Sequence, residues 1–344
     1  MHGRAVLLLC GVLSAPSAIA ADFIGKVIDS STWGYTYGYG PSIVEENGFL
    51  HMFYCSTGSD TQTHWDTIRH SVSEDGYQWS APTKILEASG GMNERAACDP
   101  SIVKFNRGDG DKYYLFYSGN IPGYETVMFV ARADYIAGPY KKLTKRNTWE
   151  ANPGDPKVIL YPKQAVVTPW YGAGQQTVVV RDGRLYSWYS DDTAGYPGAR
   201  ESRIYFSSTT DPTSWPSGQQ TNVASASVDV KWDPGSSTFV MYAVEPHHGV
   251  DSHLAMRRSA DGINWSPVQW NVCDASCFPD YAHNVGVSGT LQGHLLGRST
   301  IVAYGAPYDL NTSCGVCWPN WDLYAHYIDT YPYAALVPIL GSTN

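Results

Sequence analysis

Charge is scarce in this sequence of 344 residues, since only 16% of them are Asp, Glu, Lys or Arg. The 23 basic residues are outnumbered by 32 acidic ones and form no cluster, which argues against nucleic acid and anionic membranes as partners. After residue 20 no apolar run reaches the length of a membrane-spanning helix, so we expect no membrane segment. Phosphate-binding P-loops, dinucleotide fingerprints, serine nucleophile elbows and HExxH zinc motifs are also missing, which excludes the enzyme classes that depend on them.

The first 20 residues have the features of a secretory signal peptide. Arg4 precedes the apolar run 5–13, and Ala18-Ile19-Ala20 has the small-x-small pattern of a cleavage site. We predict cleavage after Ala20, which leaves a mature chain of residues 21–344 that is secreted or periplasmic.

Six cysteines remain in the mature chain, and an even number in an exported protein favours disulfides. They are Cys55, Cys98, Cys273, Cys277, Cys314 and Cys317. The C-x3-C and C-x2-C spacings of the last four would also suit a four-thiolate zinc site, an alternative that the sequence leaves open. We expect disulfides and no bound metal.

The sequence repeats weakly five times, each time as an apolar strand, a turn and a second strand rich in aromatics. These pairs span 41–55, 100–118, 176–190, 228–245 and 285–305, and a third strand follows each. Asn-Gly at 47–48 and Asp-Gly at 182–183 are hairpin signals. Equivalent apolar positions recur every 52 to 76 residues, a period typical of propeller blades with about four strands: Ile43, Ile102, Val178, Val230 and Val287.

We therefore predict an all-β fold, a single-domain five-bladed β-propeller. The blades are expected at approximately 34–92, 93–165, 166–220, 221–272 and 273–344. Segments 23–29 and 334–340 are both strand-like, and the sequence does not decide which of them completes the last blade. The Ser-x-Asp-Gly-x-x-Trp-Ser motifs at 73–80 and 259–266 are interpreted as structural hairpins.

Propeller topology brings the loops before first strands and after second strands to one mouth of the central channel. Three acids in or beside these loops are the candidates for catalysis: Asp99, Glu245 and Asp66. The candidates for substrate binding are Tyr37, Tyr39, Glu94, Arg95, Gln175, Gln176, Asp191, His247, His283 and Asn284. Cys55 and Cys98 belong to neighbouring loops of this mouth, so a bridge between them would brace Asp99.

Cleavage of a glycosidic bond needs one protonated carboxylic acid and one ionised carboxylate. Asp99 precedes Pro100 at the start of a central strand, so we assign it the ionised role. Glu245 leaves an apolar strand, and partial burial there would raise its pKa and suit the acid role. Asp66 could orient a substrate hydroxyl or adjust the pKa of a partner acid. Each acid also fits a structural role, as a turn aspartate or a solvated loop residue, and the sequence leaves this open.

The run "CDPSIVKF" (98–105), the five-blade period and the Ser-x-Asp-Gly-x-x-Trp-Ser motifs together resemble furanosidase-type propeller glycosidases, meaning glycoside hydrolase family 43 and its invertase-like relatives. The resemblance implies three acids at the starts of innermost strands. Only Asp99 matches, because Gly40 stands at the equivalent place in the first blade. The other strand starts hold Gln175 with Gln176, Ala226 with Ser227, and His283 with Asn284.

Our first hypothesis is a secreted glycoside hydrolase that acts on a furanoside- or pentose-containing polysaccharide. The alternative is a non-catalytic propeller that binds carbohydrate at the same aromatic-lined mouth. A weaker third hypothesis is a propeller that binds protein at the cell surface. We expect no cofactor, although a structural calcium from acids and carbonyls at the channel stays open.

Overall fold

The computed structural model describes residues 21–60, 64–90, 94–121, 124–163, 171–191, 202–247, 249–268, 270–273, 280–297, 299–307 and 320–328. The predicted signal peptide, the strand-like segment 334–340 and the side chains of Cys273, Cys277, Cys314 and Cys317 lie outside the described residues.

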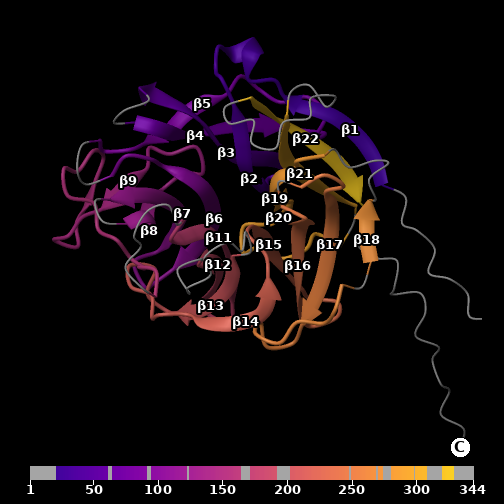
Figure 1. Cartoon of the computed structure of the whole chain (residues 1–344). Coiled ribbons are helices and arrows are strands. Elements are labelled where there is room, and N and C mark those ends of the chain that lie inside the picture. The colour runs from indigo at the N-terminus through magenta and orange to yellow at the C-terminus, as the bar shows by residue number, and fades with distance from the viewer. Residues whose placement is uncertain are drawn as a thin grey trace, which may run out of the picture.

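Five β-sheets are arranged radially around a central axis, which Figure 1 views end on. The first blade consists of β2 (Gly38–Glu46), β3 (Phe49–Asp60), β4 (His64–Ser73) and β5 (Thr83–Glu87), with the short β20 (Gly289–Thr290) on its inner edge. The second consists of β6 (Cys98–Asn106), β7 (Asp111–Ile121), β8 (Tyr124–Ala133), β9 (Lys141–Leu143) and β10 (Trp149–Glu150). The third consists of β11 (Ala173–Arg181), β12 (Arg184–Asp191), β13 (Arg203–Thr209) and β14 (Gln219–Ala224).

The fourth blade consists of β15 (Val228–Asp233), β16 (Thr238–Glu245), β17 (His253–Ser259) and β18 (Trp270–Cys273). The fifth consists of β19 (His283–Val287), β21 (Thr300–Pro307), β22 (Trp321–Ile328) and β1 (Ala21–Ile28). The predicted five-bladed all-β propeller is confirmed. The helical element of the described residues is the single-turn η1 (Ser31–Trp33), so this part of the chain contains no helix that could cross a bilayer.

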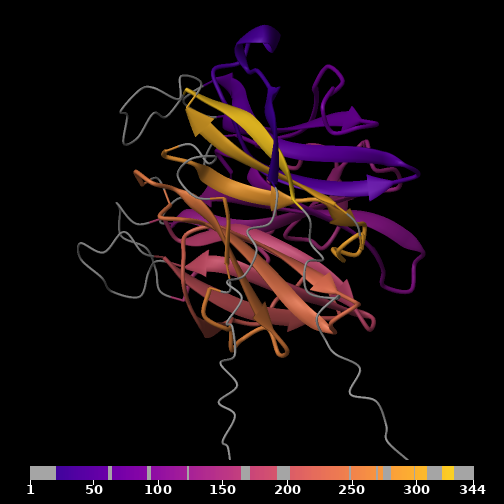
Figure 2. The same cartoon turned by 90° about the vertical axis from the view of Figure 1, so that its right-hand side faces the viewer.

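The ring is closed by the N-terminal strand. β1 pairs antiparallel with β22 along the outer edge of the fifth blade, so residues from the two ends of the chain share one sheet. Figure 1 shows β1 beside β22 at the rim of the ring, and Figure 2 shows the same edge from the side. Of the two strand-like segments, 23–29 is therefore the one that the described structure places in the last blade.

Apolar side chains fill the space between neighbouring blades. The junction between the first and fifth blades, for example, buries Ile43 and Met52 of one sheet against Ile301 and Leu323 of the other. Strands alternate their side chains between two faces, and in the inner strands both faces are covered by adjacent blades. This explains why the inner strands read as nearly continuous apolar runs rather than as alternating patterns.

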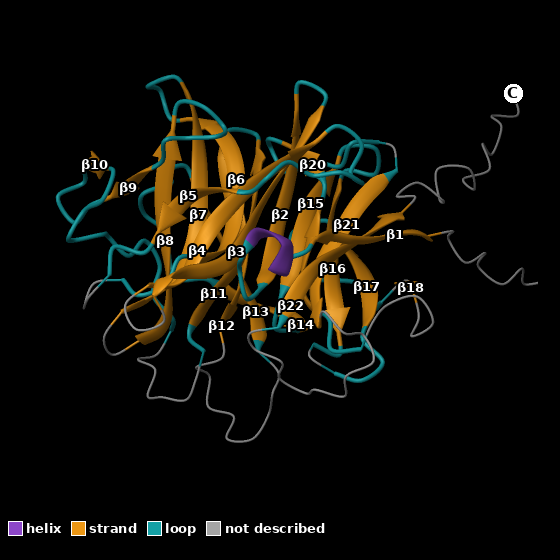
Figure 3. Ribbon diagram, turned by 90° about the horizontal axis from the view of Figure 1, so that it is seen from above, coloured by secondary structure: helices purple, strands orange, loops and turns teal. Residues whose placement is uncertain are grey.

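One end of the channel is crossed by the turn 288–295. Its backbone carbonyls at 291, 292 and 293 accept hydrogen bonds from the N–H groups of Lys104, Val180 and Trp232, which lie near the ends of β6, β11 and β15. Figure 3, a side view of the ring, shows β20 of this turn at one rim. The starts of the innermost strands lie at the other rim, where the predicted site residues are.

The Ser-x-Asp-Gly-x-x-Trp-Ser motifs form structural hairpins, as interpreted from the sequence. The carboxylate of Asp261 accepts backbone N–H bonds from Ile263 and Asn264, and the indole of Trp265 donates to the carbonyl of Gly262. These bonds hold the pKa of Asp261 well below its ordinary value. The aspartate of this motif therefore caps a turn.

Candidate functional site

Four innermost strands begin with a β-bulge at the same place. The register with the next strand shifts between Tyr39 and Ser42, Cys98 and Ser101, Gly174 and Thr177, and His283 and Val285. In each bulge one residue adopts a left-handed backbone, namely Gly40 (φ 60°), Asp99 (φ 46°), Gln175 (φ 51°) and Asn284 (φ 43°). A positive φ is uncommon outside glycine, and such residues cluster at functional sites, where bulges re-aim side chains.

Asp99 lies at the centre of this set. Its Oδ1 accepts a hydrogen bond from Nδ2 of Asn284 (2.9 Å) and its Oδ2 accepts one from the hydroxyl of Tyr171 (2.7 Å). Its backbone carbonyl accepts a bond from Nε2 of Gln176 (2.7 Å). Burial raises the pKa of the Asp99 carboxyl, and the bonds from Tyr171 and Asn284 offset part of that rise. The carboxylate is thus buried and oriented by neighbours from two other blades, the third and the fifth.

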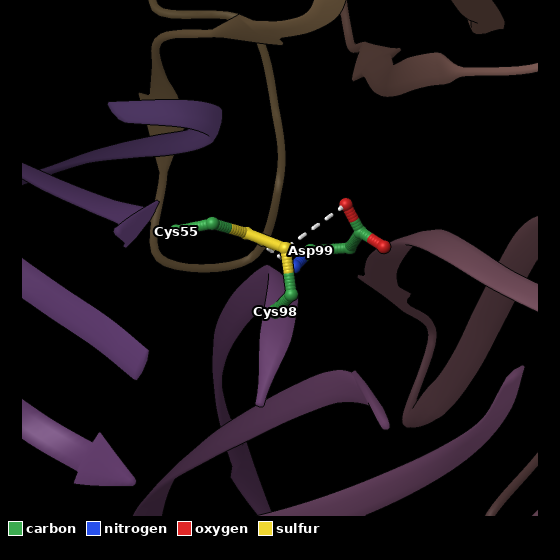
Figure 4. A group of neighbouring side chains, drawn as sticks. All are labelled: Cys55, Cys98 and Asp99. Atoms are coloured by element: carbon green, nitrogen blue, oxygen red, sulfur yellow. Dashed lines mark hydrogen bonds between the residues drawn. A yellow bond between two sulfur atoms is a disulfide. The ribbon is translucent and has the colours of Figure 1, made fainter. Parts of the chain in front are cut away.

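A disulfide joins Cys55 of β3 to Cys98 of β6, which confirms a disulfide among the cysteines and shows that these two are partners. The backbone N–H of Asp99 donates to Sγ of Cys55 (2.8 Å), and Sγ of Cys98 lies 3.6 Å from Oδ1 of Asp99. Figure 4 shows the two sulfurs directly beside the aspartate. The bridge therefore ties the first blade to the second at the residue that needs a fixed position.

The same three residues form the one group of candidate metal ligands found among the described residues. Because both sulfurs are bonded to each other, neither offers a thiolate, and a single carboxylate does not make a metal site.

Asp66, on β4, is the second buried acid of the mouth. Its Oδ1 accepts a hydrogen bond from the hydroxyl of Tyr37 (2.5 Å), and the hydroxyl of Tyr39 lies 3.5 Å from its Oδ2. Burial raises the pKa of Asp66 to about 7, and the nearby charge of Asp99 adds to the rise. Two carboxyl groups that interact in a low-dielectric setting do not ionise together easily, so at neutral pH one of the pair tends to hold a proton.

Gly40 occupies the place in the first blade that Asp99 occupies in the second. A Cβ on Gly40 would lie 3.1 Å from Sγ of Cys55 and 3.3 Å from both Nδ2 of Asn284 and Oδ1 of Asp99. These contacts would be tighter than ordinary van der Waals contact and the positive φ adds strain, so a side chain at position 40 would require its neighbours to shift.

Amide side chains from the third and fifth blades complete the ring around Asp99. Gln175 donates through Nε2 to Oδ1 of Asn284 (3.2 Å), and Ser118 donates to Oε1 of Gln176 (3.2 Å). Gln176 and Asn284 are buried, whereas Gln175 is half-buried. The sequence placed these residues at the mouth, and the structure brings them into one hydrogen-bonded network.

Aromatic rings line the side of the mouth formed by the first and fifth blades. His283 stacks on Trp321, with ring centroids 4.5 Å apart, and lies 5.4 Å from the ring of Tyr39. His247 contacts His283 at 4.5 Å, and its Nε2 lies 3.4 Å from Oδ1 of Asn284. The predicted histidines therefore join the same network as Asp99.

Glu245 ends β16 and is held by an ion pair. Nη1 and Nη2 of Arg257 donate to Oε1 and Oε2 of Glu245 at 2.7 and 2.9 Å. A bidentate pair occupies both carboxylate oxygens. Among the described contacts of Asp99 none involves Glu245, whereas the charge of Asp99 acts on the carboxyl of Asp66.

Three further candidates take part in interactions within the protein. Glu94 is fully buried and pairs with Nζ of Lys142, which also donates to the carbonyl of Glu87. The backbone of Arg95 bonds to Asn120 and Trp65. Asp191 is buried and accepts a bond from the backbone N–H of Lys163 (2.9 Å). These contacts hold the mouth loops in place.

The sequence did not reveal three partners of the site residues, namely Tyr171, Arg257 and Lys142. Tyr171 lies in a mouth loop four residues before Gln175, so its place was visible but its contact was not. Glu245 is paired with His253 across β16 and β17, and strand alternation puts Arg257 on the same face. The alternation of side chains along β17 could therefore have indicated the Glu245–Arg257 ion pair.

No protein-family model matches the sequence, and the comparison with curated proteins finds no relative. Solved structures do match. An α-L-arabinofuranosidase from Podospora anserina in complex with cellotriose has a TM-score of 0.64 and 15% identity over 91% of this chain and 98% of that one. A family 117 glycoside hydrolase from Zobellia galactanivorans has a TM-score of 0.59 and 16% identity over 91% of each chain.

An N-acetylgalactosamine deacetylase from F. plautii in complex with a blood group B trisaccharide is equally similar, with a TM-score of 0.59, 16% identity and coverage of 90% and 95%. At such identities the likeness concerns the fold, and one fold can carry different reactions. The chain is thus similar in fold, over about nine tenths of its length, to furanosidase-type propeller glycoside hydrolases.

Proposed function

We propose that this protein is a glycoside hydrolase that acts on a furanoside- or pentose-containing polysaccharide. The observation that carries the proposal is the pair of buried, electrostatically coupled carboxyl groups, Asp66 and Asp99, at one mouth of the propeller. Glycosidic cleavage uses two such groups in opposite protonation states. The similar fold of known arabinofuranosidases supports the same reaction class.

In this proposal Asp66 carries the proton. Its pKa of about 7 keeps the carboxyl protonated in mildly acidic solution, as a general acid requires. Asp99 is the ionised partner, because Asn284 and Tyr171 donate hydrogen bonds to its two oxygens. It acts on the sugar directly or through a water, according to the separation of the two carboxyl groups in the complex.

Glu245 is the other candidate for the proton donor. Both of its oxygens accept bonds from Arg257, so it can protonate a leaving group only after that ion pair opens. Glu245→Gln therefore distinguishes the two assignments.

The substrate class follows from the mouth and from the similar structures. Half-buried Tyr171, Gln175 and His247 present hydroxyl, amide and imidazole groups that suit neutral sugar hydroxyls. One similar structure was solved with cellotriose and another, a GH62 hydrolase, with xylotriose. An arabinofuranose side chain on a xylan backbone is the first substrate to test. The leader-like residues 1–20 and the disulfide support export.

The second candidate function is carbohydrate binding without cleavage at the same mouth. The observation that favours it is Gly40, which stands where the resemblance implies an acid and where a Cβ would crowd Cys55 and Asn284.

The test is an assay of wild type, Asp99→Asn, Asp66→Asn and Glu245→Gln on a nitrophenyl α-L-arabinofuranoside, arabinoxylan and xylo-oligosaccharides, with calorimetric binding in parallel. We expect cleavage by wild type, losses of about a thousandfold or more for both aspartate variants, and activity within about tenfold for Glu245→Gln. Binding by wild type with no products would favour the non-catalytic alternative. A folded Glu245→Gln that is as inactive as Asp99→Asn would move the acid role to Glu245.

A further inference from the structure

Asn284 is the side chain that links the strand starts around Asp99. It is the second residue of β19 and has a left-handed backbone in the bulge there; it is buried and donates through Nδ2 to Oδ1 of Asp99 at 2.9 Å. Its Oδ1 accepts a bond from Nε2 of Gln175 at 3.2 Å and lies 3.4 Å from Nε2 of His247. One amide thus connects residues from the second, third, fourth and fifth blades.

These contacts fix the orientation of the amide. An Asn side chain has one accepting and one donating end. Because Gln175 donates to the oxygen, the NH₂ group must face Asp99. On the first-blade side the absence of a side chain at Gly40 leaves the amide its place, since a Cβ there would lie 3.3 Å from Nδ2 of Asn284.

We propose that Asn284 is the positioning residue of the site: its fixed amide sets the direction of the Asp99 carboxylate and stabilises the ionised form. The proposal rests on the proposed function in one respect, namely that Asp99 works as an ionised carboxylate. An acid at position 284 could not replace the amide, because it would place a second negative charge where the hydrogen-bond donor now lies.

The other titratable groups that face Asp99 come from three elements. They are Asp66 on β4, Tyr39 on β2 and Tyr171 in the segment before β11. Burial disfavours ionisation of Asp99, whereas the hydroxyl of Tyr171 favours it, as Asn284 does. Asn284 therefore acts against burial. Removal of its amide should raise the pKa of Asp99.

The experiment compares Asn284→Ala with wild type by two readouts. The first is the pKa of Asp99 from NMR of protein labelled with ¹³C at aspartate side-chain carboxyls, with Asp99→Asn to assign the signal. The second is the pH profile of kcat and KM on the best substrate. We expect the Asp99 pKa to rise by about one unit or more, and the acidic limb of kcat to move with it while KM changes less. Asn284→Asp should raise the pKa further.

Ser101→Ala is the matched control. Ser101 lies two residues after Asp99 and is also buried. Its hydroxyl accepts one hydrogen bond, from the N–H of Val178 at 2.9 Å, and the substitution removes that bond while leaving the contacts of the Asp99 carboxylate in place. It should leave the Asp99 pKa unchanged. If Asn284→Ala does not fold, Gln175→Ala tests the same series of hydrogen bonds, because Gln175 donates to Asn284. We then expect a smaller rise of the Asp99 pKa. An Asp99 pKa that is equal in wild type and the folded variant overturns the proposal. If wild type cleaves no glycan, the proposed function fails, but the NMR result still decides the role of Asn284.

Discussion

Asp66 should make the protein less stable at neutral pH than it would be with a neutral side chain. The substitution Asp66→Asn keeps the shape and removes the charge. Burial raises the pKa of this carboxyl from 3.8 to about 7 in the folded protein, whereas the unfolded chain keeps the ordinary value. Each unit of difference corresponds to 1.36 kcal/mol, so the folded state disfavours the ionised carboxylate by roughly 4 kcal/mol.

The sign follows from proton binding. Between pH 3.8 and about 7 the folded protein holds a proton on Asp66 that the unfolded chain has released, so the free energy of unfolding falls as the pH rises. The full contribution is present below pH 3.8 and is lost above about pH 7. Asn does not titrate, and every other titratable group is present in both proteins. Asp66→Asn should therefore match wild type near pH 4 and exceed it by roughly 4 kcal/mol near pH 8.

The assay is urea unfolding followed by tryptophan fluorescence at several pH values from 4.5 to 8.5. The quantity of interest is the difference between the two proteins at each pH, since it isolates Asp66. Asp229→Asn is the contrasting control: Asp229 is also buried, but both of its oxygens pair with Nζ of Lys231 at 2.7 Å. Its loss leaves a buried ammonium without a counter-charge and should destabilise the protein by about 3–5 kcal/mol. A difference between Asp66→Asn and wild type that stays flat with pH would refute the reasoning.

Three further substitutions test the packing around the site by the same unfolding measurement. Lys142→Met leaves the buried carboxylate of Glu94 unpaired and should cost about 3–5 kcal/mol, and Glu94→Gln in the same chain should recover part of it. Gly40→Ala should destabilise more than Gly48→Ala, because both have positive φ but only the Gly40 Cβ would meet other atoms within 4 Å; equal losses would contradict the packing argument. Cys55→Ser opens the disulfide, whose partners are 43 residues apart, and should cost about 4 kcal/mol, whereas unchanged stability would mean that the bridge constrains little.

The fold was predictable because its signals are local and repeated. Asn47 and Asp182 adopt the positive φ that their Asn-Gly and Asp-Gly turns require, and each is followed by a glycine that does the same. Five such strand pairs with one period leave few alternatives to a propeller. Which terminal strand closes the ring depends on pairing between Ala21–Ile28 and Trp321–Ile328, a contact across the whole chain that no local pattern encodes.

The candidate site was predictable as a group of loops but not as a set of contacts. Topology alone brought Asp99, Asp66, Asn284 and His247 to one mouth, and the structure joins them through hydrogen bonds and charge. Partners depend on register and on backbone angles. The sequence placed Asp99 at the start of a strand as a catalytic candidate, but it gave no sign of the φ of 46° or of the hydrogen bond from Asn284.

Gly40 bears on how many acids the reaction can use. A left-handed bulge at this position would aim an acid at Asp99, yet the sulfur of Cys55 already lies 3.1 Å from where its Cβ would be. An acid at position 40 would therefore crowd the disulfide. Because Gly40 carries no carboxyl, the proposed reaction would take its proton donor from another strand. Asp66, one hairpin further along the same blade, has the burial and the coupling to Asp99 that the proposed role requires.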